Sequence, residues 1–257
     1  PTEIDWRKKG VLTPVKNQGA CGSCWTFASV ETLESRWAQK TGELQELSEQ
    51  FVLDCVANPR QCGGTGGCMG GTAKLVYDGI RSLDGIPSEW TYPYSSGSGA
   101  KGTCHGTPLA PSMEKPHGGL VAKAANITGH VSLPTNDYDA IMYAIAEGPL
   151  AVSVDAGAWH DYEEGVFAGG NATNPTLDHL VQLVGYGTTG DEEYFIIRNS
   201  WTPLWGESGF MRLNRSAGAA CGVDLRPMDG DGCKGGPKAV KVCGQNGILY
   251  DAVYPLV

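Results

Sequence analysis

Long apolar runs are absent from this chain of 257 residues, and basic residues are in the minority. No stretch approaches the roughly 18 apolar residues that a membrane-spanning helix needs, so we expect no membrane span. Lys and Arg number 19 against 28 Asp and Glu, which gives a formal net charge of −9. That balance argues against a nucleic-acid partner, because such a partner requires a basic face.

The chain also lacks an initial Met and an apolar leader. It begins at Pro1 with the run to Trp6, which has the character of an end made by processing. We therefore expect that any pre- or pro-segment has been removed.

Cysteine, in contrast, is plentiful, with nine residues at positions 21, 24, 55, 62, 68, 104, 221, 233 and 243. That number indicates an oxidising compartment, and because it is odd, at least one thiol should stay unpaired or bond outside the chain. Glycosylation sequons begin at Asn126, Asn171 and Asn214. They agree with passage through the secretory pathway.

Helical patterns occupy the first part of the chain. From Cys24 the apolar residues follow one helical stripe, and Gly42 is placed to end that helix after Lys40. Ser48 can cap a second helix, and a third is expected around 73–80. Residues 95–119 are rich in Gly, Ser and Pro and are expected to form a loop.

The second part has a different character. One helix is expected over 137–147, and strand-like runs cover 150–154, 180–186, 194–198, 210–213 and 248–254. A helical N-terminal part followed by a β-rich C-terminal part predicts an α+β fold with two lobes.

We expect one domain over 1–257, with a helical lobe at roughly 10–115 and a β-rich lobe at 116–257. The N- and C-terminal segments are expected to cross over between the lobes. Residues 226–244 contain two cysteines among Gly, Lys and Asp, and are expected to form a disulfide-pinned surface insertion.

The segment from Gln18 to Trp25 carries the clearest chemical signal. A thiolate is a much stronger nucleophile than a thiol. Cys24 lies at the expected start of a helix, where free backbone N–H groups and the helix dipole favour negative charge. Gly19 and Gly22 permit the tight backbone that would present the sulfur to solvent.

Cys21 and Cys24 could instead form a redox pair or half of a zinc site. A zinc site needs a second pair at similar spacing, and the sequence has none. A redox pair needs a strand before it within a βαβ pattern, whereas a Pro/Gly loop precedes Cys21. We therefore expect no metal and no cofactor.

A thiolate protease also needs a base. His179 begins an expected buried strand, and Asn199 ends the next one, so adjacent strands can bring the two together. Asn199 could then orient the imidazole while Trp201 shields their hydrogen bond from water. The other histidines are expected at the surface; they are His105, His117, His130 and His160.

With these residues in place, the sequence resembles the papain and cathepsin L family. The resemblance begins with the run from Cys21 to Trp25 and extends over nearly the whole chain. The further matching segments are Asp5–Arg7, Pro14–Gln18, Leu47–Gln50, Cys68–Gly71, Tyr92–Tyr94, Trp205–Gly209 and Ile248–Pro255.

The resemblance implies a papain-like two-lobe fold with the active site in the cleft between the lobes. It implies an endopeptidase with Cys24 as nucleophile, His179 as acid and base, and Asn199 as its orienter. The side chain of Gln18 and the backbone N–H of Cys24 would form the oxyanion hole. It further implies peptide and protein substrates, a removed inhibitory propeptide, a monomer, and a lysosomal, vacuolar or secreted location.

A substrate surface is implied in the same way. The second subsite, which holds the residue before the scissile one, would have Asp251 as its floor. Its walls would be Thr72, Ala73, Ser153 and Leu177, and further substrate contacts would come from Gly70, Gly71, Asp178 and Trp201. Asp251 could pair with a basic substrate side chain; the alternative is that it points to solvent.

The resemblance implies the disulfides Cys21–Cys68 and Cys55–Cys104. The remaining four cysteines allow three pairings, and we favour Cys233–Cys243 with Cys62–Cys221, because the short loop closes at low entropic cost.

The sequence departs from the family in two places. Thr202-Pro203 follows Trp201 where the family has Gly. The family's bridge from a cysteine before the catalytic His cannot form, because no cysteine lies between Cys104 and Cys221.

Other activities on the same fold remain open. An exopeptidase would use loop histidines such as His105 and His117, although nothing else marks them for that role. A peptide ligase or transpeptidase would let an amine outcompete water at the thioester. Loss of any of the four catalytic residues would have favoured a non-catalytic peptide-binding homologue, and all four are present.

Overall fold

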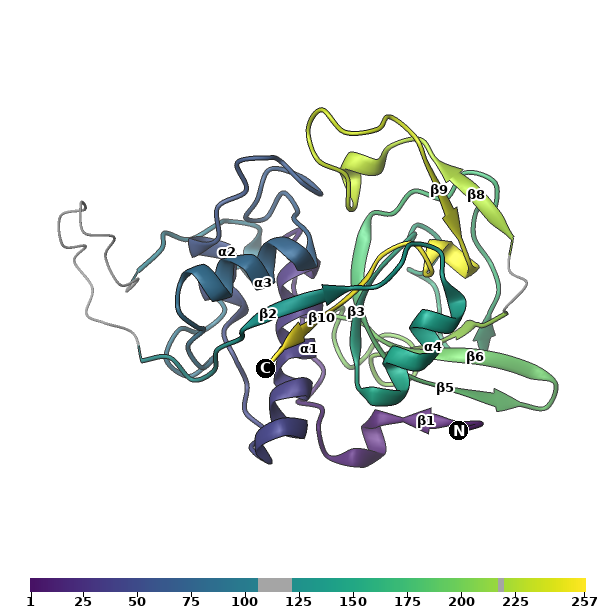
Figure 1. Cartoon of the computed structure of the whole chain (residues 1–257), viewed down its shortest axis with the longest axis horizontal. Helices are drawn as coiled ribbons and strands as arrows, with labels where there is room; N and C mark the ends of the chain where they lie inside the picture. Colours follow the sequence, from purple (N-terminus) through teal and green to yellow (C-terminus); the bar gives the residue numbers. More distant parts are fainter. Residues whose placement is uncertain (106–121, 217–219) are drawn as a thin grey trace.

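The computed structural model describes residues 1–105, 122–216 and 220–257. Figure 1 shows helices α1 to α3 on one side and most strands on the other, with β2 and β10 running between them. None of the helices in these residues is long and apolar enough to cross a membrane. The expected boundary between 115 and 116 lies outside the described residues.

The helices of the first part begin and end at the residues that their caps favour. Helix α1 (Cys24–Thr41) ends at Gly42, which has the left-handed φ of 79° that Gly adopts without strain. Helix α2 (Glu49–Cys55) starts after Ser48, whose Oγ accepts a 2.9 Å hydrogen bond from the backbone N–H of Phe51.

Two further helices are capped by their preceding side chains. Thr72 accepts from the N–H of Leu75 at the start of α3 (Ala73–Ser82). Asp137 accepts from Ala140 at the start of α4 (Tyr138–Glu147). All four helices lie where the sequence predicts them. Short 3-10 turns cover Trp6–Lys9, Ser96–Ser98, Pro227–Asp229 and Gln245–Gly247.

The main sheet has eight strands among the described residues, in the order β2-β10-β3-β5-β6-β7-β4, with β1 paired to β5. Their bounds are β1 Ile4–Asp5, β2 Gly129–Ser132, β3 Leu150–Val154, β4 Val166–Phe167, β5 His179–Thr189, β6 Glu192–Arg198, β7 Phe210–Asn214 and β10 Ala252–Leu256. A separate two-stranded sheet pairs β8 (Cys221–Asp224) with β9 (Val240–Cys243). The expected strand over 248–254 is shorter than predicted, because the chain turns through Ile248 and enters β10 only at Ala252.

Helix α1 joins the two halves of the molecule. One hydrophobic core surrounds α1 to α3, and a second lies against the sheet. Between them, buried Gln182 of β5 donates hydrogen bonds to the backbone oxygen of Glu31 and to Ser35 Oγ of α1. Arg198 of β6 lies 3.1 Å from Glu31, and both side chains are buried. These contacts fix the middle of α1 against β5 and β6.

Disulfides Cys21–Cys68 and Cys55–Cys104 are present. The other expected pairs are wrong, because the structure joins Cys62 to Cys233 and Cys221 to Cys243. Loop length did not decide this pairing. The antiparallel register of β8 and β9 places Cys221 directly opposite Cys243, which leaves Cys233 for Cys62.

The segment expected as an insertion is thus held at both ends. Strands β8 and β9 form its base, closed by the Cys221–Cys243 bond. Its outer loop is tied to the helical side of the molecule by the Cys62–Cys233 bond.

Candidate active site

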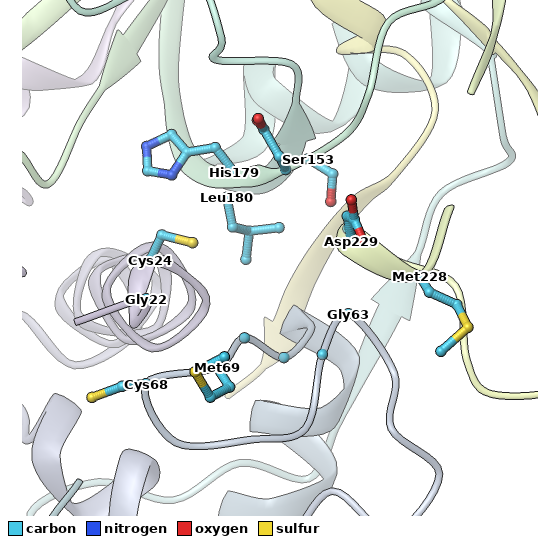
Figure 2. A pocket seen from close by; sticks show the side chains of 15 residues that line it. Gly22, Cys24, Gly63, Cys68, Met69, Ser153, His179, Leu180, Met228 and Asp229 are labelled. Carbon is cyan, nitrogen blue, oxygen red and sulfur yellow. The ribbon is translucent and has the colours of Figure 1, made fainter. Parts of the chain in front are cut away.

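Cys24 occupies the first position of α1 and lines a cavity of about 310 Å³. The described wall of the cavity includes the start of β5, the loop at Gly70 and Gly71, and Ser153 of β3. Figure 2 shows Cys24 and the His179 imidazole next to each other at one side of this cavity. The packing of α1 against β5 therefore brings the expected nucleophile and the expected base together.

His179 is oriented by Asn199. The imidazole Nε2 lies 2.8 Å from Asn199 Oδ1, and both residues are buried. The same Oδ1 accepts the backbone N–H of Ser200 at 2.8 Å, which identifies it as the oxygen of the amide. Nε2 must then donate a hydrogen to it, and the other ring nitrogen, Nδ1, remains for the thiol.

The environment of Cys24 favours the thiolate. Burial by itself raises the pKa of the thiol, but the hydrogen bond and the charge of His179 outweigh burial and hold the pKa below its usual value. The backbone N–H groups of Leu180 and Trp25 add to the lowering of this pKa. Cys24 is the free cysteine of the chain. It is therefore the thiol with both the freedom and the ionisation that nucleophilic attack requires.

Aromatic rings cover the His179–Asn199 hydrogen bond. Trp201 stacks on His179 with ring centroids 4.9 Å apart, and Trp159 meets His179 edge-on. His160, which was expected to be a simple surface residue, is exposed but stacks on Trp201 with centroids 5.0 Å apart. No periodic pattern in the sequence signals this contact.

Gln18 is held in the loop before α1 by several hydrogen bonds and is not on the described wall of the cavity. Its Oε1 accepts from Ser200 Oγ at 2.7 Å, and its Nε2 donates to the backbone oxygen of Cys21 at 3.0 Å. An amide NH₂ carries two hydrogens, so one of them remains for a substrate atom. Gln18 is thus oriented both by the loop that leads into Cys24 and by Ser200, which follows β6.

The loop after Trp201 has a backbone conformation that suits the Gly which the resemblance leads us to expect at position 202. Thr202 adopts a φ of 77°, which is unfavourable for a β-branched residue. Its Oγ1 accepts the backbone N–H of Leu204 at 3.0 Å. The loop therefore keeps a left-handed conformation with Thr in place of Gly, at a cost of about 1–2 kcal/mol.

Only part of the expected substrate surface lies on this cavity. Four of the expected residues line it: Gly70, Gly71, Ser153 and Asp178. The other expected residues are not on its described wall: Thr72, Ala73, Leu177, Trp201 and Asp251. Sequence reasoning also missed Met69, within the matching segment Cys68–Gly71, and wall residues from outside the family motifs, namely Gly63, Gly64, Met228, Asp229 and Gly230.

Asp251 neither forms the floor of this cavity nor points to solvent. It is 4% exposed, accepts a hydrogen bond from Ser153 Oγ, and lies 2.9 Å from Lys74 Nζ. Lys74 also pairs with Asp231 of the insertion at 3.1 Å. The insertion therefore covers the place where an open carboxylate was expected.

The remaining candidates lie away from the cavity wall. Asn126 and Asn171 are exposed, whereas Asn214 is partly buried at the end of β7. His105 is exposed, and His130 lies 3.6 Å from Asp78. His117 lies outside the described residues.

The family model for the papain family cysteine protease matches residues 1–230, and the chain belongs to that family. The resemblance drawn from the motifs and the predicted two-lobe α+β fold are thereby confirmed. Among curated relatives, vignain from Phaseolus vulgaris is 40% identical over 233 residues, covering 88% of this chain and 59% of the relative. A cathepsin L-like peptidase from Aedes aegypti is 38% identical over 227 residues, covering 87% and 61%. The chain thus spans about three fifths of the length of these relatives.

Among solved structures, the bromelain protease from Ananas comosus in complex with the E64 inhibitor is similar with a TM-score of 0.75 and 36% identity. The match covers 100% of this chain and 99% of that chain. The proform of the ragweed pollen protease Amb a 11 gives a TM-score of 0.75 at 31% identity, covering 100% of this chain and 65% of that chain.

Proposed function

We propose that this chain is a cysteine endopeptidase that hydrolyses peptide bonds through a thioester on Cys24. The observation that supports this most is the meeting of Cys24 and His179 on the cavity, with buried Asn199 hydrogen-bonded to the imidazole and the thiol pKa lowered by His179. The named activities of similar proteins, which include cysteine endopeptidases, agree with it.

The geometry supports a mechanism in two halves. The Cys24 thiolate attacks the peptide carbonyl carbon, and His179 passes its proton to the leaving amine as the carbon–nitrogen bond breaks. The remaining acyl group is then a thioester on Cys24. His179 next takes a proton from water, the hydroxide attacks the thioester carbon, and the carbon–sulfur bond breaks to return the thiolate. Asn199 holds the ring in one tautomer throughout.

The proposed role of Cys24 can be tested with a thiol-directed peptidyl epoxide. We expect one equivalent of the reagent to react and mass mapping to place it on Cys24, because the other cysteines are held in disulfides. If an alkylating agent first blocks the Cys24 thiol in the denatured protein, the epoxide should no longer label the protein after refolding. A label on a different residue, or none on a folded protein, would contradict the assignment.

Gln18 and the backbone N–H of Cys24 are proposed to hold the oxyanion. Gln18→Ala should lower kcat/KM about 10²–10³-fold with little change in KM, because one donor to the developing negative charge is worth about 2.7–4 kcal/mol. Steady-state kinetics on a fluorogenic peptide measures this. Gln39→Ala, at the exposed far end of α1, is the matched control. The proposed role of Gln18 would be contradicted if kcat/KM fell by less than about threefold. It would also be contradicted if thermal melting showed that the fall in kcat/KM came from unfolding.

We further propose peptide and protein substrates, a monomer, and removal of an inhibitory propeptide. The comparison with a proform of a related protease agrees with the last point. A lysosomal, vacuolar or secreted location is proposed because the four disulfides suit an oxidising compartment. One relative is named a KDEL-tailed cysteine endopeptidase.

A further inference from the structure

The insertion contributes directly to the wall of the active-site cavity. Met228, Asp229 and Gly230 line the same cavity as Cys24 and His179. These residues belong to the 3-10 turn and the residue after it, between β8 and β9. The turn between β8 and β9 therefore faces the same cavity as the reacting groups.

The insertion also closes one end of this cavity. Gly63, from the helical side, and Gly230 both line it, and the backbone N–H of Gly63 donates to Gly232 at 2.9 Å. The Cys62–Cys233 disulfide fixes this junction covalently. The two sides of the cavity are therefore joined at this end by backbone and covalent bonds.

The junction lies on the residues expected to form the second subsite. A Cβ built on Gly230 would lie 2.2 Å from the backbone oxygen of Leu177, so the insertion backbone rests directly on that residue. Asp231, the next residue, pairs with Lys74 and shares it with Asp251. The single ammonium of Lys74 thus forms ion pairs with both carboxylates.

Asp229 is differently placed. Figure 2 shows its carboxylate turned toward the side of the cavity where Ser153 lies, while Met228 turns away. It forms an ion pair with Arg226, 3.5 Å away. The side chain of Asp229 is 48% exposed and that of Arg226 is 68% exposed. Such a solvated pair contributes little, so Asp229 is available to another cation.

The charges around the cavity favour a positive ligand. Asp178 is a second carboxylate on the wall, and the described wall includes neither Lys nor Arg. The Asp178 side chain already accepts the backbone N–H of Ala156, which fixes its position. Asp229 and Asp178 thus place two carboxylates on this wall, and the cation beside them is the exposed guanidinium of Arg226, which a substrate cation can displace.

We propose that Asp229 is a specificity-determining residue that binds a positively charged group of the substrate at the closed end of the cavity. This inference rests on the proposed peptidase function for its substrate class. The cation can come from a Lys or Arg side chain before the scissile residue, or from the free α-ammonium of a chain that begins at the closed end. Both sources offer N–H donors to a carboxylate.

Binding to the full chain carrying Cys24→Ala separates these sources without requiring catalysis. One peptide pair carries Arg or neutral citrulline before the scissile residue, with the N-terminus acetylated. A second pair carries a neutral residue there and a free or acetylated N-terminus. Calorimetry should show about tenfold tighter binding of the charged member in one pair at least, which corresponds to about 1.4 kcal/mol. The peptide pair that shows this preference identifies whether the cation is a side chain or the α-ammonium.

Asp229→Asn in the same background should remove that preference while leaving the neutral peptides unchanged. Asp191→Asn, an exposed carboxylate in the turn between β5 and β6, makes the same change in charge outside the cavity and should retain the preference. A preference that survives Asp229→Asn, or a lack of measurable binding or of preference in both pairs, would overturn the inference.

The same charged and neutral peptides can be compared as substrates of the active protein. With Cys24 present, the charged substrate should show about tenfold higher kcat/KM, lost in Asp229→Asn. Cleavage of all four peptides without a charge preference would reject the role of Asp229 and keep the peptidase. A charge preference in binding with no thiol-dependent cleavage would reject the peptidase and keep the cation site.

Discussion

Cys24→Ala is expected to lower kcat/KM for peptide hydrolysis by about 10⁴-fold or more, because the described wall of the cavity holds no second free thiol to form the thioester. The thiol is free, lies at the first position of α1, and has its pKa lowered by His179. Cys24→Ser should be nearly as inactive, because an alcohol beside the same base remains protonated. Active-site titration and steady-state kinetics on one fluorogenic peptide measure both variants.

Folding should be unaffected by these substitutions. Cys24 takes part in no disulfide, and the residue is only partly buried, so both variants should melt within a few degrees of the native protein. Circular dichroism melting is the control. If either variant kept more than about one hundredth of the native kcat/KM, the thioester mechanism would have to be abandoned.

Features set by local chemistry could be predicted from the sequence. Ser48 and Asp137 cap helices because a side-chain oxygen one turn before a helix satisfies a free N–H, and both caps are present. The position of Cys24 at the start of a helix follows from the same kind of local pattern. The meeting of His179 with Asn199 follows from the antiparallel pairing of β5 with β6.

Features set by long-range packing could not be predicted. Loop length favoured Cys233–Cys243, but the register of β8 with β9 determines the pairing, and register is not visible in the composition of a Gly-rich segment. The sequence marked Asp251 as a possible open carboxylate. Its burial depends on Lys74 and on a loop that returns from the insertion, and neither effect is local.

The place of Asp229 on the cavity wall could not be predicted from the sequence for the same reason. None of the sequence segments that carry the family resemblance includes Asp229, which lies in the short 3-10 turn Pro227–Asp229. Its place on the cavity follows from the Cys62–Cys233 bond and from the contact of Gly230 with Leu177. The turn that carries Asp229 therefore forms part of the cavity wall although it contains no motif residue, and only the folded chain places it beside Cys24 and His179.

His179→Ala is expected to lower kcat/KM about 10³–10⁴-fold and to raise the pKa of the Cys24 thiol. In the native protein the hydrogen bond and charge of His179 lower that pKa against the effect of burial. Without the imidazole, burial remains, and it favours the neutral thiol. The thiolate fraction at about pH 6 should then fall sharply, since an ordinary thiol ionises near about pH 8.5.

Alkylation by iodoacetamide, followed as a function of pH with mass mapping to Cys24, measures this shift directly. The native profile should extend to acidic pH, whereas that of His179→Ala should begin to rise only at alkaline pH. His160→Ala is the matched control, because His160 also stacks on Trp201 but is exposed and lies on the outer side of the aromatic cover. It should leave the alkylation profile unmoved. If His179→Ala kept the native profile, the low thiol pKa would have to come from the start of α1 alone, and His179 would act only in proton transfer.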